Sequence, residues 1–140
     1  MQRALEADDV RAVFAARGGY GAMRLLPQLK WLAAPRVLSG FSDVTALHCA
    51  AQTAGWKSLH APVLTQLGRQ SAECLDRFFH LLESTTPAAP LEGGTCLVPG
   101  VVEGPLLGGN LSVLTRLLGT PYLPPLDGAV LLLEDVGERP

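Results

Sequence analysis

Short apolar runs alternate with amphipathic segments along the first part of the chain. The runs at 10–16 and 36–40 have the length and the Val, Leu and Phe content of buried strands, so we expect strands there. The segments 44–55 and 71–84 carry apolar residues at three- and four-residue spacing, which predicts helices. An order of strand, helix, strand, helix is typical of a parallel sheet with helices on its faces.

A Pro-, Gly- and Thr-rich stretch at 85–94 has the composition of a linker. After it, 95–109 resembles short strands with turns, 110–119 predicts a helix and 129–136 predicts a strand. We therefore predict an α/β lobe at 1–86, a linker at 87–91 and a smaller β-rich lobe at 92–140. Only two clear strands precede the linker, and both ends of the chain look cut, so we expect a fold that is incomplete at both ends.

Composition and charge narrow the classes of function. Hydrophobic residues make up 48% of the chain and charged residues 17%, which is enough apolar material for a core and argues against disorder. The net charge is −2 and there is no basic block, so nucleic acid is not the expected partner. The chain shows neither a signal peptide nor an apolar run of the roughly 18 residues that a membrane span needs.

The three cysteines are odd in number and widely spaced, at Cys49, Cys74 and Cys96. This pattern favours reduced thiols in a cytoplasm over a disulfide framework. The sequence contains no His-x-x-x-His pair and no Cys/His cluster, so we expect no metal and no other cofactor.

The segment Gly40-Phe41-Ser42-Asp43 joins a predicted strand to a predicted helix. Ser and Asp are common helix N-caps, and on local chemistry capping is the favoured interpretation. The same pattern also fits a nucleophile elbow, in which a Ser at a tight strand-to-helix turn is presented at the sheet edge. Val44 stands where the usual G-x-S-x-G signature has its second Gly, so the local signature alone does not decide between the two.

Two other places carry candidate chemistry. The Gly-rich turn at 17–21 could direct backbone N–H groups at an anion, or it could be only a tight turn. A dinucleotide-binding fingerprint would need a third Gly where Arg24 stands, so nucleotide binding is disfavoured. Glu134 ends a predicted strand, where catalytic acids often lie in α/β folds, although a solvated turn is the simpler interpretation.

Five segments, in order along the chain, resemble the LD-carboxypeptidase family. They are ARGGYGAMRLLPQL, GFSDVTALH, LHAPV, EGPLLGGNLSVLTRLLGTPYLP and VLLLEDVGERP. The family comprises serine peptidases called murein tetrapeptide carboxypeptidases, peptidase family S66, and is related to the microcin-immunity peptidases. The resemblance implies an N-terminal α/β lobe of the class I glutamine-amidotransferase-like kind and a smaller, mostly β C-terminal lobe.

The resemblance also implies roles for individual residues. Ser42 matches the family nucleophile and Glu134 the acid of a Ser-His-Glu triad, while the N–H groups of Gly18 and Asp43 match the oxyanion hole. None of the three histidines, His48, His60 and His80, matches the Gly-His motif that supplies the family's base, so the chain resembles an internal fragment and we expect it to be inactive alone. Our candidates for binding the substrate are Arg17, Arg24 and Asn110.

The function implied by the resemblance is hydrolysis of the L,D-peptide bond to the terminal D-alanine of murein tetrapeptides, without metal or cofactor. It would take place in cytoplasmic cell-wall recycling, and the full-length protein would be a homodimer. Three alternatives stay open: a non-catalytic module that binds muropeptides, a peptidase of the microcin-immunity type, and a nucleotide-binding βα domain that uses the Gly-rich turn.

Overall fold

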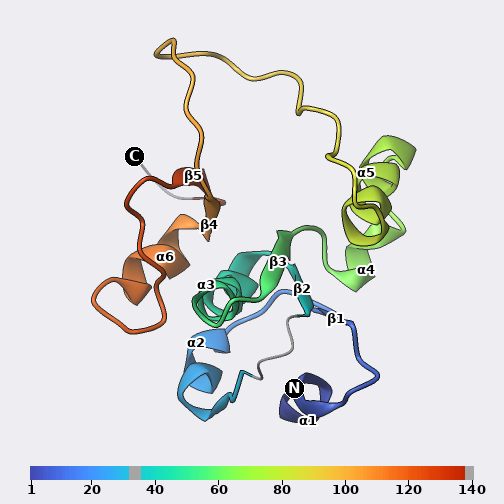
Figure 1. The fold of residues 1–140 in the computed structure, drawn as a ribbon, viewed down its shortest axis with the longest axis vertical. Coiled ribbons are helices and arrows are strands. Elements are labelled where there is room, and N and C mark those ends of the chain that lie inside the picture. Colours follow the sequence, from blue (N-terminus) through green and yellow to red (C-terminus); the bar gives the residue numbers. More distant parts are fainter. Residues whose placement is uncertain (32–35, 138–140) are drawn as a thin grey trace.

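The computed structural model describes residues 1–31 and 36–137, in which short strands alternate with helices (Figure 1). The strands are β1 Ala12–Phe14, β2 Val37–Gly40, β3 Lys57–His60, β4 Leu106–Asn110 and β5 Val130–Glu134. The helices are α1 Gln2–Glu6, α2 Ala22–Leu25, α3 Thr45–Thr53, α4 Leu64–Leu67, α5 Ala72–Glu83 and α6 Leu111–Leu117. Two short 3-10 helices, η1 Leu26–Gln28 and η2 Ser42–Val44, precede the second strand and the third helix respectively.

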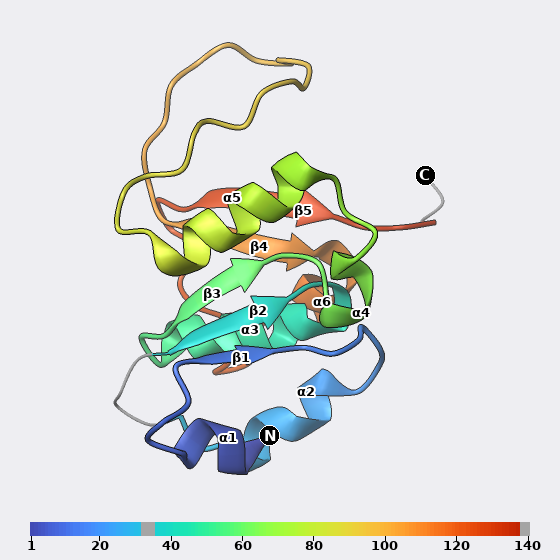
Figure 2. The same ribbon diagram turned by 90° about the vertical axis from the view of Figure 1, so that its right-hand side faces the viewer.

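All pairings between strands are parallel, as the alternation of strand and helix predicts. β1, β2 and β3 form one sheet in that order, and β4 pairs with β5 in a second sheet. Figure 2 shows the strands side by side in the order β5, β4, β3, β2, β1, with their arrows pointing the same way. The sequence analysis missed β3, because Lys-Ser-Leu-His lacks an apolar run and becomes a strand through its pairing with β2.

Helices cover both faces of this strand layer (Figure 1). Helix α3 packs against β2, β3 and β4, and it is also in contact with α6. Nearly all of α3 is buried, from Thr45 to Ala51, which explains its run of small and apolar residues. On the opposite face, the amphipathic helix α5 places Phe78 against Phe14 of β1, with ring centroids 6.1 Å apart. The observed architecture is therefore α/β with parallel strands, as expected.

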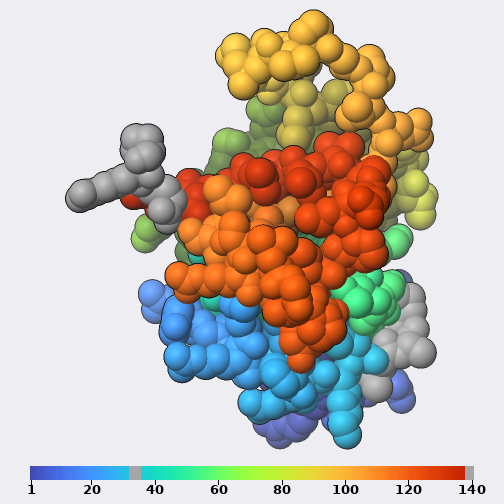
Figure 3. Space-filling model, turned by 90° about the vertical axis from the view of Figure 1, so that its left-hand side faces the viewer, coloured from blue at the N-terminus to red at the C-terminus, as the bar shows by residue number. Residues whose placement is uncertain are grey.

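A single hydrophobic core includes residues from both halves of the chain. Leu38 and Ala46 of the first half lie in the same buried cluster as Leu117 of α6, with Val113 and Tyr122 packed against it. In the space-filling view, the orange surface of residues near α6 lies directly against the blue surface of residues near α2 (Figure 3). The predicted lobes thus share one core, and the boundaries at 86 and 92 stay a prediction.

Residues 84–105 form no helix or strand. The expectation of short strands at 95–105 is therefore wrong, and the first strand of the second half begins at Leu106. The apolar side chains responsible for that expectation are almost fully exposed, for example Leu97 at 89% and Val101 at 100%. Without a neighbouring strand to pair with, apolar residues alone do not make this segment a strand. Within the described ranges, no helix is long and apolar enough to cross a membrane.

Candidate active site

The candidate residues gather where the parallel strands end. Gly40 and His60 are paired at the carboxyl ends of β2 and β3, and Asn110 and Glu134 are paired at the carboxyl ends of β4 and β5. The Gly-rich turn follows the carboxyl end of β1. In open parallel sheets, this edge is where ligands bind, because the strand-to-helix loops all open there.

Ser42 lies at a sharp turn between β2 and α3. Its φ of 63° makes it the one non-glycine residue with positive φ among the residues described, a conformation that costs a serine on the order of 1–3 kcal/mol. Gly40, just before the turn, has no room for a side chain, since a Cβ there would lie 2.9 Å from the Cβ of Ala15. Strand, strained serine and helix together have the geometry of a nucleophile elbow, which simple helix capping does not require.

The Gly-rich turn lies directly against this elbow. A Cβ added at Gly18 would come within 3.9 Å of Ser42 Oγ, so the two turns are in contact. Asp43 fixes their relative position, because its Oδ2 accepts a hydrogen bond of 2.8 Å from the Ala22 N–H at the start of α2. The Asp43 side chain therefore caps a helix, although the helix is α2 rather than α3.

A cavity of about 370 Å³ opens beside Ser42. Its walls include Arg24 and Asn110, two of the three predicted substrate-binding residues, whereas Arg17 does not line it. Sequence reasoning missed Ser112 and Arg116 of α6, which also line the cavity. Their four-residue spacing on a helix capped by Asn110 was the available signal, since it places both on one helix face.

Asp135 fixes the α6 side of the cavity. Its carboxylate accepts hydrogen bonds from Asn110 Nδ2 at 3.0 Å and from Ser112 Oγ at 2.7 Å, and also from the Ser112 backbone N–H at 3.0 Å. The hydrogen bond from the Ser112 side chain is the largest cause that lowers the pKa of Asp135 to about 2. Asn110 Oδ1 in turn accepts from the Val113 N–H, so this residue caps α6 as expected.

Glu134 lies next to a histidine of the other sheet. Its Oε1 is 3.9 Å from Nε2 of His60, and both side chains are about 30% exposed or less. Burial lowers the pKa of His60, while the charge of Glu134 acts in the opposite direction. Glu134 is therefore a half-buried acid at the sheet edge and not a solvated turn residue, and His60 ends a strand instead of lying in a loop.

The other two histidines have backbone partners. His48 is 3% exposed, and its Nε2 lies 2.9 Å from the Gly40 carbonyl oxygen. Desolvation lowers the pKa of His48 to about 4, so it is neutral at neutral pH and donates to that oxygen from Nε2. His80 on α5 lies near the carbonyl oxygens of Thr86 and Pro87. Across the described ranges, no three His, Cys, Asp or Glu residues are grouped as a metal site would require.

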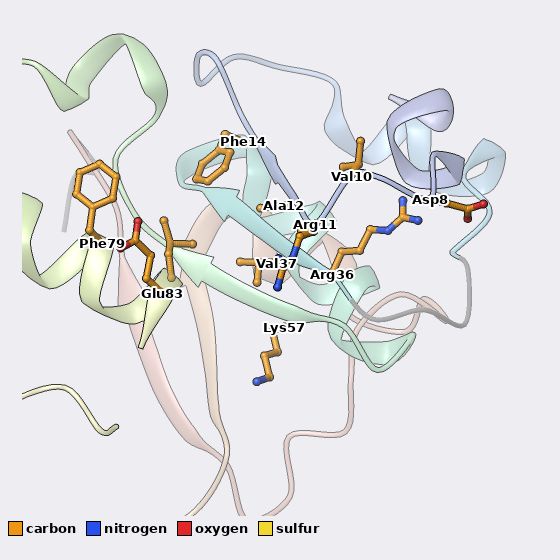
Figure 4. A pocket seen from close by; sticks show the side chains of 11 residues that line it. Asp8, Val10, Arg11, Ala12, Phe14, Arg36, Val37, Lys57, Phe79 and Glu83 are labelled. Carbon is orange, nitrogen blue, oxygen red and sulfur yellow. The ribbon is translucent and has the colours of Figure 1, made fainter. Parts of the chain in front are cut away.

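A second cavity, larger than the one beside Ser42, lies elsewhere. It has a volume of about 870 Å³ and is found at the amino ends of the strands, between the sheet and α5 (Figure 4). Arg36 at its edge donates to the carbonyl oxygens of Ala4 and Leu5 at the end of α1, so this cation already has partners within the fold. The smaller cavity beside Ser42 is the better candidate site, because it lies at the carboxyl ends of the strands.

Comparison with known proteins agrees with this geometry. Residues 1–61 match the LD-carboxypeptidase N-terminal domain, and residues 103–140 match the LD-carboxypeptidase C-terminal domain. The chain is 38% identical to the probable murein peptide carboxypeptidase of Bacillus subtilis and 37% identical to the murein tetrapeptide carboxypeptidase of Pseudomonas aeruginosa. These alignments cover 95% and 99% of the chain but 44% and 50% of the relatives, so the chain spans about half of their length.

Solved structures show the same arrangement of elements. The muramoyltetrapeptide carboxypeptidase of Oxalobacter formigenes superposes with a TM-score of 0.83 at 35% identity, covering 97% of this chain and 48% of that one. An MccF-like protein of Bacillus anthracis superposes with a TM-score of 0.80 at 24% identity over 94% of this chain and 49% of that one, a likeness of fold alone. The N-terminal domain match contains the Ser42 turn, and the C-terminal domain match contains the strands that end at Asn110 and Glu134. The two matches, in this order, show that this chain belongs to the LD-carboxypeptidase family.

Proposed function

We propose that this chain carries the nucleophile and the acid of a serine carboxypeptidase that removes the terminal D-alanine of murein tetrapeptides by cleaving an L,D-peptide bond. The observation that carries the proposal is Ser42, held at a φ of 63° in a strand-to-helix turn beside a cavity. A fold retains such strain where the surrounding structure enforces it, and strained residues cluster at active sites.

In this mechanism, Ser42 Oγ attacks the carbonyl carbon of the scissile bond while an imidazole removes the hydroxyl proton. Glu134 orients that imidazole and stabilises its positive charge. The backbone N–H groups of Gly18 and Asp43 stabilise the negative charge on the carbonyl oxygen. The imidazole then gives its proton to the leaving amine of D-alanine, and water hydrolyses the acyl-enzyme.

Charge in the cavity supports a peptide with a free carboxylate as the substrate. Arg24 and Arg116 both line the cavity, and Arg24 also stacks over Tyr20 at 5.2 Å from the ring centroid. A guanidinium can hold a carboxylate through two parallel hydrogen bonds, which would select a chain end over an internal peptide bond. We propose that Arg24, with Asn110 and Arg116, binds the terminal carboxylate. Arg17, which lies outside the cavity walls, becomes a weaker candidate.

A second candidate function is the binding of muropeptides without turnover. The observation in its favour is that each histidine has another neighbour, namely Gly40 for His48, Glu134 for His60, and the Thr86 and Pro87 carbonyls for His80. Among the described residues, no imidazole lies within hydrogen-bond distance of Ser42 Oγ. Because a serine without a base is a poor nucleophile, we expect the 140-residue chain alone to bind a tetrapeptide without cleaving it at a useful rate.

The test measures D-alanine release from a murein tetrapeptide by the 140-residue chain and by the longest natural form of the protein. A fluorophosphonate probe, which phosphonylates an activated serine with loss of fluoride, is applied to both. We expect the longest form to release D-alanine and to be labelled, and Ser42→Ala to abolish both. Ser84→Ala, on the exposed segment after α5, is the matched control and should leave both unchanged.

Full activity of Ser42→Ala in the longest form would refute the nucleophile assignment. Binding of the tetrapeptide without labelling or release in either form would favour the muropeptide-binding module. The cytoplasmic location and the homodimer, both implied by the family resemblance, are part of this proposal. Fractionation of cells and gel filtration of the longest form would test them.

A further inference from the structure

We propose that His60 is a positioning residue that holds the Glu134 carboxylate in the orientation its catalytic role requires. The inference rests on the proposed function, because Glu134 is the acid of the proposed triad. It goes beyond that function by assigning a role to a histidine that is neither the nucleophile nor the base.

The first support is geometric. His60 ends β3 of one sheet and Glu134 ends β5 of the other, and their Nε2 and Oε1 atoms face each other at 3.9 Å. Glu134 Oε1 is buried and accepts no hydrogen bond from any described residue, and His60 Nδ1 is likewise buried without a partner. The imidazole Nε2 is therefore the polar group directed at the buried oxygen of the acid.

The second support is that the fold fixes the imidazole itself. His60 is paired with Gly40 in the β2–β3 register, and the next N–H, that of Ala61, donates to the Gly40 carbonyl oxygen at 3.0 Å. The His60 ring has two other rings as neighbours, with centroids 6.3 Å from Phe41 and 6.2 Å from His48. A ring held in this way is a rigid reference point for a flexible glutamate side chain.

The third support is the protonation state. Burial lowers the pKa of His60, so the ring is neutral at neutral pH and can donate one hydrogen bond. The charged or titratable groups near it are Glu134 from β5 and the neutral His48 from α3. A neutral His60 can hold one oxygen of the Glu134 carboxylate and leave the carboxylate charge to stabilise the catalytic imidazolium. A protonated His60 would compete with the imidazolium for that charge.

The 3.9 Å between His60 Nε2 and Glu134 Oε1 is longer than a hydrogen bond, whose N···O distance is about 2.7–3.2 Å. Catalytic hydrogen bonds are often long without substrate and shorten in the complex, so we expect this contact to close when substrate binds. Only the tautomer with the proton on Nε2 can donate to Glu134, and this tautomer is a specific consequence of the proposal.

The first experiment measures kcat and KM for D-alanine release by the longest natural form of the protein. Leucine at position 60 keeps much of the side-chain volume but has no donor, whereas glutamine places an amide N–H near the position of Nε2. We expect His60→Leu to lower kcat about 10- to 100-fold with little change in KM, by analogy with groups that orient other ligands, and His60→Gln to recover most of it. His80→Leu, on α5 and half-buried like His60 but with no contact to Glu134, is the matched control and should leave both constants unchanged.

Three results would overturn the inference. If His60→Gln is as impaired as His60→Leu while both variants keep the wild-type circular dichroism spectrum, the ring only fills space. If both variants lose activity to the extent of Ser42→Ala, His60 is the base itself. If His60→Leu is within twofold of the wild type, the contact has no catalytic consequence.

A second measurement does not depend on activity and separates this inference from the proposed function. Imidazole nitrogen shifts of labelled 140-residue chain report the tautomer and the titration of His60 by NMR. We expect the Nε2–H form at neutral pH, and a lower His60 pKa in Glu134→Gln because the carboxylate charge that raises it is gone. An Nδ1–H tautomer, or a titration unchanged by Glu134→Gln, would refute the contact even if Ser42 proves to be the nucleophile.

Discussion

Gly109 lies where β4 passes close to the start of helix α3. The Asn110 N–H donates to Thr45 Oγ1 at 3.0 Å, and a Cβ on Gly109 would lie only 2.5 Å from the same oxygen. Its φ of 129° also lies outside the range that other residues readily adopt. This one glycine therefore allows the second half of the chain to pack against the helix that carries the elbow.

We expect Gly109→Ala to lower the free energy of unfolding by about 3 kcal/mol, since it combines overpacking with a strained φ. Urea denaturation followed by circular dichroism measures the change. Gly68→Ala is the matched control, because Gly68 has φ −65° and open space around its Cβ position, and it should change stability by less than about 1 kcal/mol. Equal effects of the two variants would contradict the close-approach argument.

Ser42 is a second single residue with a large effect, because the backbone strain that its proposed role requires lowers the stability of the fold. Glycine tolerates a φ of 63° where serine does not, so we expect Ser42→Gly to raise the free energy of unfolding by about 1 kcal/mol, while Ser42→Ala leaves it nearly unchanged. The same denaturation measurement separates them. Loss of stability in Ser42→Gly would mean that the hydroxyl makes a stabilising contact outweighing the backbone strain.

At the scale of elements, Asp135 connects strand β5 to helix α6. Its carboxylate accepts from the side chain and the backbone of Ser112, and from the side chain of Asn110. We expect Asp135→Leu, which has similar size but no acceptor, to speed amide hydrogen exchange in α6 and to weaken tetrapeptide binding at the adjacent cavity. Asp127→Leu, in the loop before β5, is the control. Unchanged exchange in α6 would show that the packing of its apolar face and the Asn110 cap hold this helix without Asp135.

Elements also show how far the sequence determines the structure. The elements α3, α5, α6 and β5 were predictable, because each has an apolar pattern or a cap that acts within its own segment. The strained turn at Ser42 was not, since its local sequence fits simple helix capping equally well. β3 was not, since four residues with one leucine become a strand only beside β2. The error at 95–105 has the opposite cause, because its apolar residues find no partner in the described chain. The His60–Glu134 contact depends on how two sheets lie together, which no local pattern specifies.

At the scale of the whole molecule, the buried His48 makes stability depend on pH. Its pKa is about 4 in the folded protein against an ordinary value of 6.5, so the unfolded chain binds more protons between these values. The contribution of the neutral His48 to the free energy of unfolding is therefore fully present above pH 6.5 and is lost as the pH falls towards 4. The shift in the pKa of His48 corresponds to a loss of roughly 3 kcal/mol in the free energy of unfolding once the pH is below both values. His60, whose pKa is also lowered, acts in the same direction.

We expect the free energy of unfolding, measured in urea from pH 8 to pH 4, to fall most steeply below pH 6.5. His48→Gln should be less stable at pH 7 but should lose less stability on acidification, because the amide can donate to the Gly40 carbonyl oxygen and does not titrate. His80→Gln, at a half-buried position on α5, should leave the pH dependence as it is. A slope for His48→Gln equal to that of the wild type would assign the acid sensitivity to other groups.

The exposed stretch at 84–105, taken together with the shared core, has a consequence for how the polypeptide can be divided. It contains two glutamates, Glu92 and Glu103, both exposed, and no lysine or arginine. Brief digestion with a glutamate-specific protease should therefore cut the chain there. The two pieces should still elute together on gel filtration, because Leu117 of one lies in the core of the other. Covalent continuity would then be dispensable, and the halves could serve as a split reporter that regenerates the elbow and its cavity when two fusion partners meet.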